Sequence, residues 1–353
     1  MKATNSLILP PFSALYSLAT RLRTVAYRQR LLSVSKLDAV VISVGNITTG
    51  GTGKTPLVEW VCRVLAAEGR RVCVLTRGYR RQNPNEQVVV SDGHKVLADV
   101  AAAGDEPLLL ARNLLGIAAV ICNANRGEAG RWAADNLQTE VFVLDDGFQH
   151  LQLERDLNIV TIDATNPWGG GMLPLGQRRE PLSGLARADC FVLTRTEETT
   201  DLSSITAELQ KTAGQKPVFR SRMVTTGLRR LGGETIDQAS SIKNPVGAFC
   251  GVGNPKSFFN HLGREGFELA LQRAFPDHHN YQQSDVDQIV AEARAKGAVS
   301  ILTTAKDAVK LSSLHFEIPC YVLEIKISID DEAQLIQMIR NQVAKYSQSK
   351  QSS

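Results

Sequence analysis

The sequence predicts an α/β protein with a large, mostly parallel sheet covered by helices on both faces, followed by a second, smaller α/β lobe. Short apolar runs alternate with amphipathic helical patterns through the first half of the 353 residues, which is typical of βαβ units. A glycine-rich segment joins the first of these runs to a helix. The same alternation begins again near residue 245, and a chain of this length accommodates two domains.

The expected elements divide the chain into five parts. In the first lobe, residues 36–215, we expect strands at residues 40–44, 72–76, 118–122, 141–144, 157–162 and 190–193, and a helix at residues 56–68. Residues 216–244 carry glycines and basic residues in short patterns and are interpreted as a linker. In the second lobe, residues 245–346, we expect strands at residues 246–250, 299–303 and 320–324, a helix after residue 255 and a last helix at residues 331–346. Residues 1–35 precede the first lobe, and residues 347–353 form a polar tail.

The composition argues against several classes of function. A net charge of +4, without a basic stripe interleaved with aromatic residues, gives no support for a nucleic-acid ligand. The six cysteines form no C-x-x-C pair, so neither a zinc site nor a redox motif is indicated. We expect no nucleic acid among its partners and no obligate protein partner.

The N-terminal segment is basic and amphipathic. Residues 1–31 carry five basic residues and no acidic one. The apolar stretch at residues 7–19 is interrupted by two prolines and is shorter than the roughly 20 residues that a spanning helix needs. Leu15, Leu18, Leu22 and Val25 recur at spacings of three and four, as in a helix that lies in a membrane interface beside anionic lipid. A helix packed on the core of the protein itself would show the same pattern.

The glycine-rich segment has the properties of a phosphate-binding P-loop. It lies between a β-branched strand and an amphipathic helix, where backbone N–H groups and the helix N-terminus can surround a nucleotide phosphate. Its phosphate-binding residues are Thr48, Thr49, Gly50, Gly51, Thr52, Gly53, Lys54 and Thr55. Lys54 would stabilise the transferring oxygens, and the Thr55 hydroxyl would bind Mg²⁺. The usual first glycine is replaced by Thr48.

Two adjacent acids follow the expected strand at residues 141–144. Such a strand directs a carboxylate from its C-terminal end toward the cation that Thr55 holds. Because neighbouring side chains of an extended strand point in opposite directions, only one of Asp145 and Asp146 would face the metal, and we favour Asp146. A turn-forming Asp-Asp-Gly sequence is the alternative.

A kinase also needs a group that accepts the proton of the acceptor hydroxyl. Asp105 precedes an apolar helix, where it is either such a base or a helix N-cap. His278 and His279 lie together in a loop of the second lobe, and they are metal ligands, surface residues or part of an acid–base pair.

A flexible segment with three consecutive glycines, residues 169–171, precedes Arg178, Arg179 and Glu180. This order is typical of a loop that closes over anionic groups, although a solvated basic turn has the same composition. Arg77 follows a strand end and is similarly placed for contact with a phosphate or the substrate.

Taken in order, these motifs resemble those of the tetraacyldisaccharide 4′-kinase family. The matching segments are residues 45–56, 76–79, 104–107, 145–150, 179–182, 250–255, 277–279 and 303–308. The resemblance covers about residues 40–325, and the threonine at position 48 is also usual in that family. It implies a P-loop NTPase-type core and a second lobe joined to it by a two-stranded linker.

The resemblance implies transfer of the γ-phosphoryl group of ATP, with Mg²⁺, to the 4′-hydroxyl of a lipid-linked substrate, tetraacyldisaccharide 1-phosphate, giving lipid IVA. The family works on the cytosolic face of the bacterial inner membrane, which favours a membrane-interface role for the N-terminal helix. Here the protein would be peripheral or shallowly anchored.

The resemblance also implies roles for individual residues. Lys54 would act on the β- and γ-phosphates, and Thr55 and Asp146 would hold the metal. Asp105 would be the catalytic base and His278 its partner, although spacing alone does not choose between His278 and His279. Arg179 would contact the nucleotide and Glu180 the metal, but both could instead contact the substrate phosphate, and no role is implied for Arg178.

The alternative function is a regulatory ATPase or GTPase switch that has no small-molecule acceptor. A GTPase would carry N-K-x-D after a late strand. The sequence there is instead Thr194, Arg195, Thr196 and Glu197. We therefore favour the kinase.

Overall fold

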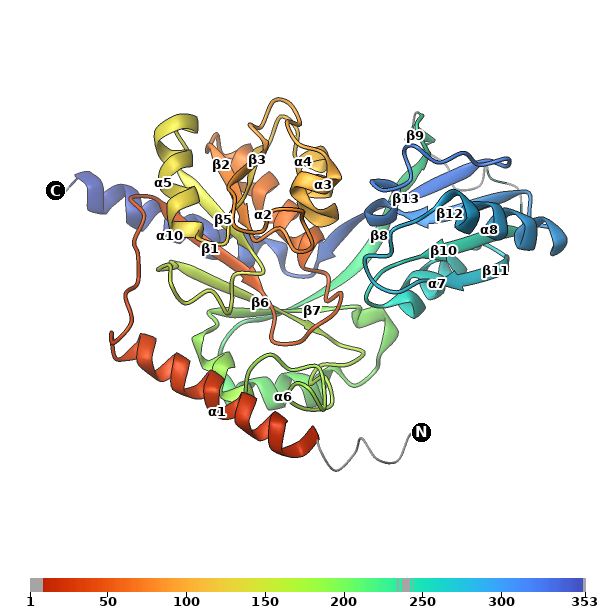
Figure 1. The fold of residues 1–353 in the computed structure, drawn as a ribbon. Helices are drawn as coiled ribbons and strands as arrows, with labels where there is room; N and C mark the ends of the chain where they lie inside the picture. The colour runs from red at the N-terminus through yellow and green to blue at the C-terminus, as the bar shows by residue number, and fades with distance from the viewer. Residues whose placement is uncertain (1–8, 234, 237–241, 243, 352–353) are drawn as a thin grey trace.

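The computed structural model describes residues 9–233, 235–236, 242 and 244–351. Two lobes are arranged along one continuous sheet, whose strands within the described residues follow the order β11-β10-β12-β13-β8-β7-β6-β1-β5-β2-β4-β3, with β9 paired to β8 (Figure 1). The first lobe holds the half from β8 to β3, and the second lobe holds the half from β11 to β13 (Figure 1).

The first lobe is built on buried parallel strands. They are β1 (Val40–Gly45), β2 (Val72–Thr76), β4 (Ala118–Cys122), β5 (Val141–Asp145), β6 (Leu157–Asp163), β7 (Cys190–Thr194) and the start of β8 (Val218–Arg230). The edge strand β3 (Val88–Ser91), which we did not predict, pairs antiparallel with β4. Short runs of β-branched residues that are buried on both faces account for this sheet.

Helices cover both faces of this sheet. The helical elements of the first lobe are α2 (Lys54–Ala67), α3 (Val100–Ala103), α4 (Asp105–Asn113), α5 (Arg126–Leu137), η1 (Leu182–Arg187), η2 (Thr196–Glu198) and α6 (Leu202–Ala213). Along β1, Val40 and Ile42 belong to the core cluster with α2 and α4, whereas Val41 belongs to the cluster with α5. Successive residues of one strand therefore meet helices on opposite faces, as predicted.

The second lobe repeats the same architecture on a smaller scale. Its elements are β10 (Val246–Cys250), α7 (Pro255–Arg264), β11 (Leu269–Ala274), α8 (Gln283–Ala295), β12 (Ser300–Thr304), α9 (Ala305–Ala308) and β13 (Cys320–Ile329). The four strands are parallel to one another.

The joint between the lobes consists of two long antiparallel strands. The first residues of β8 pair with β7 of the first lobe, and β8 then pairs with β13 from Ser221 opposite Ile329 to Arg230 opposite Tyr321. Much of the predicted linker is thus strand. The short β9 (Thr235–Ile236) pairs with β8, while residues 234, 237–241 and 243 of that linker lie outside the described residues.

The assignment of the C-terminal helix to the second lobe was wrong. Helix α10 (Glu332–Gln351) returns to the first lobe, where Leu335, Ile339 and Val343 join the core cluster of α2 and β1. The hydroxyl of Tyr346 donates to Asp38, 2.6 Å away. Because β13 runs antiparallel to β8, the chain leaves it at the end nearer the first lobe. The helix also extends into the predicted tail.

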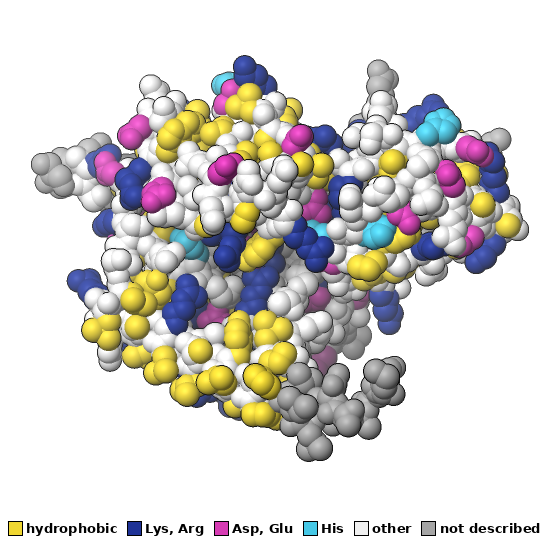
Figure 2. Space-filling view, in the orientation of Figure 1, with side chains coloured by type: hydrophobic (Ala, Val, Ile, Leu, Met, Phe, Trp, Pro, Cys, Tyr) yellow, Lys and Arg dark blue, Asp and Glu magenta, His cyan; other side chains and the backbone are white. Residues whose placement is uncertain are grey.

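Helix α1 (Leu9–Arg28) lies along the outside of the first lobe (Figure 1). The Ser13 hydroxyl on its inner face donates to the Met172 carbonyl, 3.1 Å away. Its outer face is apolar and exposed, with 63% of Leu15 and 61% of Leu22 accessible, and Figure 2 shows this apolar band along the lower edge of the molecule. Among the described residues, no helix is long and apolar enough to span a bilayer.

Candidate active site

The loop between β1 and α2 is held in shape by its own side chains. The buried amide nitrogen of Asn46 donates to the Thr48 carbonyl at 2.7 Å and to the Thr52 hydroxyl at 2.9 Å. The amide oxygen accepts from Lys54 Nζ at 3.3 Å. Gly53, with φ of 78°, allows the turn into α2, whose first N–H groups have no partner within the helix. The loop therefore presents backbone donors and an ammonium group to an anion.

Asp146 lies beside this loop because β5 pairs in register with β1, so that Asp145 is opposite Val44. Its carboxylate is 3.6 Å from Lys54 Nζ and 2.5 Å from Arg179 Nη1. Although burial opposes ionisation, Lys54 and Arg179 lower the pKa of Asp146. Its buried Oδ1 atom has no hydrogen-bond partner.

The neighbouring acid, Asp145, has a different environment. Burial, together with the charges of Glu106 and Asp146, raises its pKa to about 6. Its Oδ2 accepts from the Thr76 hydroxyl at 3.1 Å. The two acids thus have different partners, and of the two only Asp146 makes an ion pair with Lys54.

The loop after the three glycines lies against the P-loop. Backbone N–H groups of Thr49 and Arg179 donate to Gln177 and Ile47, each at 2.7 Å. Thr48 also forms an isolated β-bridge with Arg178. This contact holds the backbone of Arg178 beside the P-loop, but the structure assigns no role to its side chain.

The structure places Glu180 differently from the predicted metal set. The buried Glu180 carboxylate accepts from Gln149 Nε2 at 2.6 Å and pairs with Arg187 at 2.6 Å. Within the described part of the chain, no hydrogen bond or ion pair joins Asp146 to Glu180 or to Thr55. Thr55 lies at the start of α2, half-buried.

The two lobes meet at a histidine–aspartate pair. Asp105 is the first residue of α4, and both of its carboxylate oxygens lie 2.8–2.9 Å from Nδ1 of His278. His278 arrives from the loop between β11 and α8, with a left-handed φ of 64°. Gly104, not Asp105, occupies the N-cap position of α4.

His279 has other partners, so the structure distinguishes the two histidines. Its Nε2 lies 3.0 Å from Asp285, and its ring stacks on Phe275. Burial opposes ionisation of Asp105, but His278, Lys306 and Lys310 hold the pKa of Asp105 below its usual range. Asp105 is therefore a carboxylate at neutral pH.

A cavity of about 220 Å³ lies between the lobes, beside the P-loop and next to residues that contact the histidine–aspartate pair. Its walls include Gly53 and Thr55 from the P-loop, and Glu106, Arg195 and Lys306 from around the histidine–aspartate pair and the joint. The P-loop and the neighbours of the histidine–aspartate pair therefore border the same space between the lobes.

A second pocket, of about 410 Å³, lies under α1. Its cationic lining residues are Arg23, Arg77, Arg126, Arg179 and Arg187. Arg126, Asp146, Gln149, His150 and Arg187, which also line it, each have a buried polar atom without a hydrogen-bond partner. Burial and the surrounding arginines lower the pKa of His150 to about 3. Such a pocket suits a polar, anionic ligand.

Arg126 and His150 line this pocket, although neither was predicted as a site residue. Arg126 starts α5 shortly after β4, on the same sheet edge as the ends of β1 and β5. A basic residue close behind a buried parallel strand was the available signal, because the C-terminal ends of parallel strands share one edge.

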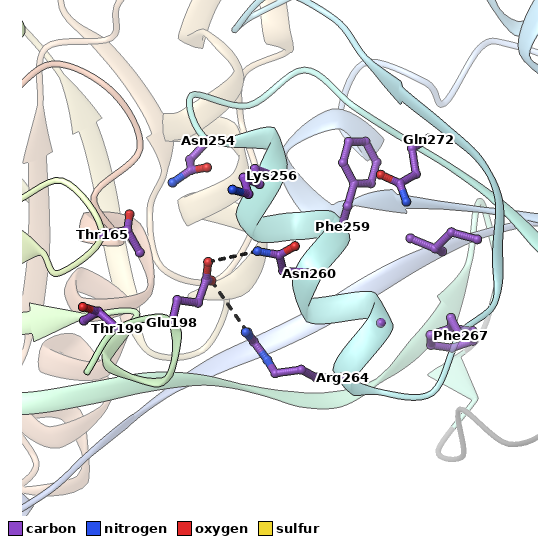
Figure 3. A pocket seen from close by; sticks show the side chains of 12 residues that line it. Thr165, Glu198, Thr199, Asn254, Lys256, Phe259, Asn260, Arg264, Phe267 and Gln272 are labelled. Atoms are coloured by element: carbon purple, nitrogen blue, oxygen red, sulfur yellow. Dashed lines mark hydrogen bonds and ion pairs between the residues drawn. The ribbon is translucent and has the colours of Figure 1, made fainter. Parts of the chain in front are cut away.

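A third, open groove of about 850 Å³ separates η2 from α7. Figure 3 shows Glu198 of the first lobe directed at Asn260 and Arg264 of α7, and Glu198 also accepts from the Ser257 hydroxyl at 2.6 Å. Arg195 donates to the Gly51 carbonyl of the P-loop and to Ser257, so the groove begins next to the P-loop.

A phosphate-binding loop paired with a strand-end carboxylate defines a P-loop protein, and a carboxylate–histidine pair where the two lobes meet is what a phosphotransferase uses to activate an acceptor. The family model described as tetraacyldisaccharide-1-P 4′-kinase matches residues 5–344. The chain belongs to this family, as the motifs predicted, and it is a kinase rather than a switch.

The relatives of this chain support the same family assignment. The tetraacyldisaccharide 4′-kinase of Halothermothrix orenii is 41% identical over 352 residues, covering 94% of this chain and 91% of the relative. That of Geobacter metallireducens is 43% identical, covering 86% and 88%. The structure is also similar to the crystal structure of LpxK from Aquifex aeolicus in complex with ATP, with 32% identity, a TM-score of 0.75, and coverage of 94% of this chain and 98% of that one. The predicted fold class is confirmed.

Proposed function

We propose that this protein transfers the γ-phosphoryl group of ATP to the 4′-hydroxyl of tetraacyldisaccharide 1-phosphate, giving lipid IVA, at the cytosolic face of the bacterial inner membrane. The observation that carries this proposal is the Asp105–His278 pair, because Glu106 and Lys306, which lie next to the pair, line the same cavity as Gly53 and Thr55 of the P-loop. A hydrolase or switch has no need of a second lobe that supplies a base partner beside the nucleotide.

In this proposal the two sites divide the chemistry. Lys54 and the first N–H groups of α2 stabilise the charge that develops on the transferring phosphoryl group. Asp105 accepts the proton of the sugar hydroxyl, and His278 orients the carboxylate through Nδ1. Arg179, which already pairs with Asp146, adds positive charge at the phosphate side.

Asp146, Thr55 and Glu180 are the residues that would hold Mg²⁺. The buried Oδ1 of Asp146 accepts no hydrogen bond and lies 3.6 Å from Lys54 Nζ, and it is the kind of hard oxygen that Mg²⁺ prefers. When bound, the ion would neutralise phosphate charge. Glu180 would have to leave its ion pair with Arg187 to reach the ion.

The groove next to the P-loop is the proposed site of the nucleotide base. The groove lies beyond the C-terminal ends of β6 and β7, whereas Asp146 follows β5 on the other side of β1. The acceptor would therefore bind on the side of β1 where Asp146 lies. Ligands of parallel α/β sheets bind outside these strand ends.

The pocket under α1 is the proposed site of the anionic disaccharide. Its arginines complement a phosphate, and Tyr16, Thr20 and Arg23 of α1 form part of its wall. The exposed apolar face of α1 continues beyond this pocket, where it would meet the acyl chains and the membrane interface.

Membrane association can be tested with liposomes of anionic phospholipid. Replacing Leu15, Leu18 and Leu22 together by glutamate should reduce partition several-fold, because charged groups disfavour the interface. A control replaces three exposed apolar residues outside α1, Leu97, Leu115 and Val299, by glutamate and should partition as the unaltered protein does. Equal partition of both triple variants would contradict the assignment of α1.

The catalytic proposal is tested in detergent micelles with tetraacyldisaccharide 1-phosphate, Mg²⁺ and ATP, followed by mass spectrometry of the lipid. We expect a product that carries one additional phosphate and is absent with Lys54→Ala. Absence of this product from folded, ATP-binding protein would contradict the proposal.

A further inference from the structure

A buried lysine of the second lobe lies against the histidine–aspartate pair. Lys306 follows β12 at the start of α9, and only 15% of its side chain is exposed. Its ammonium group is 2.7 Å from Glu106 of the first lobe and 3.1 Å from Asp277 of its own lobe. Lys306 therefore links the element that carries Asp105 to the loop that carries His278.

The same ammonium group faces the outer nitrogen of His278. Lys306 Nζ lies 3.4 Å from Nε2, while Nδ1 of that ring lies 2.8 Å from Asp105. An ammonium group has three donors and no acceptor, so Nε2 can interact with it favourably only as an unprotonated acceptor. In a neutral imidazole the proton then resides on Nδ1, where it is donated to Asp105.

The other charges around the ring do not displace this arrangement. Nε2 also lies 3.9 Å from Glu106 and 3.6 Å from Asp277, which by themselves would favour an imidazolium. Both carboxylates lie nearer to Lys306 Nζ than to His278 Nε2, and each forms an ion pair with the lysine. Burial disfavours the charged amine, but Glu106, Asp105 and Asp277 raise the pKa of Lys306, so it is cationic at neutral pH.

We propose that Lys306 is a positioning residue for phosphoryl transfer, which fixes His278 as the Nδ1–H tautomer and so orients the Asp105 carboxylate toward the sugar hydroxyl. This inference rests on the proposed function for its catalytic consequence, but the tautomer itself is a property of the protein alone. Asp105 then needs no proton exchange with His278 before it accepts the proton of the substrate.

Lys306 is held at this point by both lobes. Glu106 belongs to α4, and Asp277 is fixed by Arg80 of the first lobe, which donates to its carbonyl at 3.1 Å. The tautomer is thus set only when α4, the His278 loop and α9 meet.

The decisive measurement is the protonation of His278 in the full-length protein. Protein labelled with ¹⁵N-histidine is examined by long-range ¹H–¹⁵N NMR at pH 7.5, and His278→Gln identifies the signals of this ring. We expect a protonated Nδ1 and an unprotonated Nε2. In Lys306→Met, Nε2 should become protonated, because Glu106 and Asp277 lose their cation. A protonated Nε2 in the unaltered protein, or an unprotonated Nε2 that persists in Lys306→Met, would overturn the proposal.

Kinetics give a second readout that a merely structural role would not produce. His278 and Lys310 pair with Asp105 directly, and the ionisable groups that surround these partners are Glu106, Asp277, Lys306 and Asp307. Lys306→Met removes a cation near Asp105, so the pKa of Asp105 should rise and the acidic limb of the kcat profile should move to higher pH. The value of kcat should fall about tenfold while KM for ATP is unchanged.

Two further variants complete the design. Lys306→Arg keeps the charge and the donors and should restore the position of the acidic limb, whereas the exposed Lys296→Met should leave tautomer and profile unchanged. An acidic limb that stays in place in Lys306→Met would overturn the positioning role. If instead the unaltered protein showed the expected tautomer but made no phosphorylated lipid, the proposed function would fail and the tautomer would stand.

Discussion

The P-loop and the Asp105–His278 pair differ in how the chain assembles them. Asn46, Thr52 and Lys54 shape the P-loop through hydrogen bonds that span at most eight residues. Asp105 and His278 are separated by 173 positions, and Glu106 and Lys306 by 200. The first site is complete within one lobe, whereas the second exists only while the two lobes are in contact.

Phosphate binding and acceptor activation are therefore separable. Loops that connect distant elements can change their relative position at little local cost, but a βα-loop with internal hydrogen bonds keeps its shape. Lobe opening would therefore leave the phosphate site intact and dismantle the base. The following predictions test that separation.

The largest effect is expected for Lys54→Ala. Removal of the ammonium group from the phosphate side should lower kcat by about 10³-fold, because the developing charge loses a preorganised cation. ATP affinity, measured by calorimetry, should fall as well. Substantial turnover in this variant would show that the P-loop is not the phosphoryl-transfer site.

A somewhat smaller effect is expected for Asp105→Asn, which removes the base but keeps the shape. The value of kcat should fall by about 10²-fold, while the affinity for ATP should match that of the unaltered protein. His278→Gln should behave similarly but more mildly. Loss of ATP binding in either variant would mean that the two sites are coupled after all.

Asn46→Ala tests the local hydrogen bonds of the P-loop. The buried amide makes contacts with Thr48, Thr52 and Lys54, and its removal should lower the free energy of unfolding by about 2 kcal/mol. It should also weaken ATP binding without moving the acidic limb of the kcat profile. Chemical denaturation and calorimetry measure the two effects. An unchanged stability would show that the loop is held by other contacts.

The smallest effect concerns Glu59, which lies in α2 and lines the cavity between the lobes. Burial raises the pKa of Glu59 to about 7, although Asn113 donates to it at 2.8 Å. In the unfolded chain the pKa of this carboxyl is the ordinary value of 4.5, so its contribution to stability declines as pH rises from about 4.5 to 7.

Glu59→Gln should therefore stabilise the protein by about 1 kcal/mol at pH 8 and have little effect at pH 4.5, since Gln can accept the same hydrogen bond. Thermal unfolding at the two pH values measures this difference. A larger stabilisation at pH 4.5 than at pH 8 would contradict the assignment.

Elements whose information is local could be predicted from the sequence. The buried parallel strands of the first lobe follow from short β-branched runs, and the P-loop follows from its glycines, Lys54 and Thr55 between a strand and a helix. The kinase family followed from the order of several such motifs. Each of these is encoded within about a dozen residues, so no distant contact is needed to recognise it.

Features that depend on residues far apart in the sequence could be seen only in the tertiary structure. Helical periodicity shows that α10 has an apolar face, but only the direction of β13 shows that this face packs on the first lobe. Spacing could not distinguish His278 from His279, because the choice depends on which ring reaches Asp105 across the lobe interface. The proposed role of Lys306 likewise depends on the three elements that meet around it. The sequence near a charged residue does not show which distant residues it will contact.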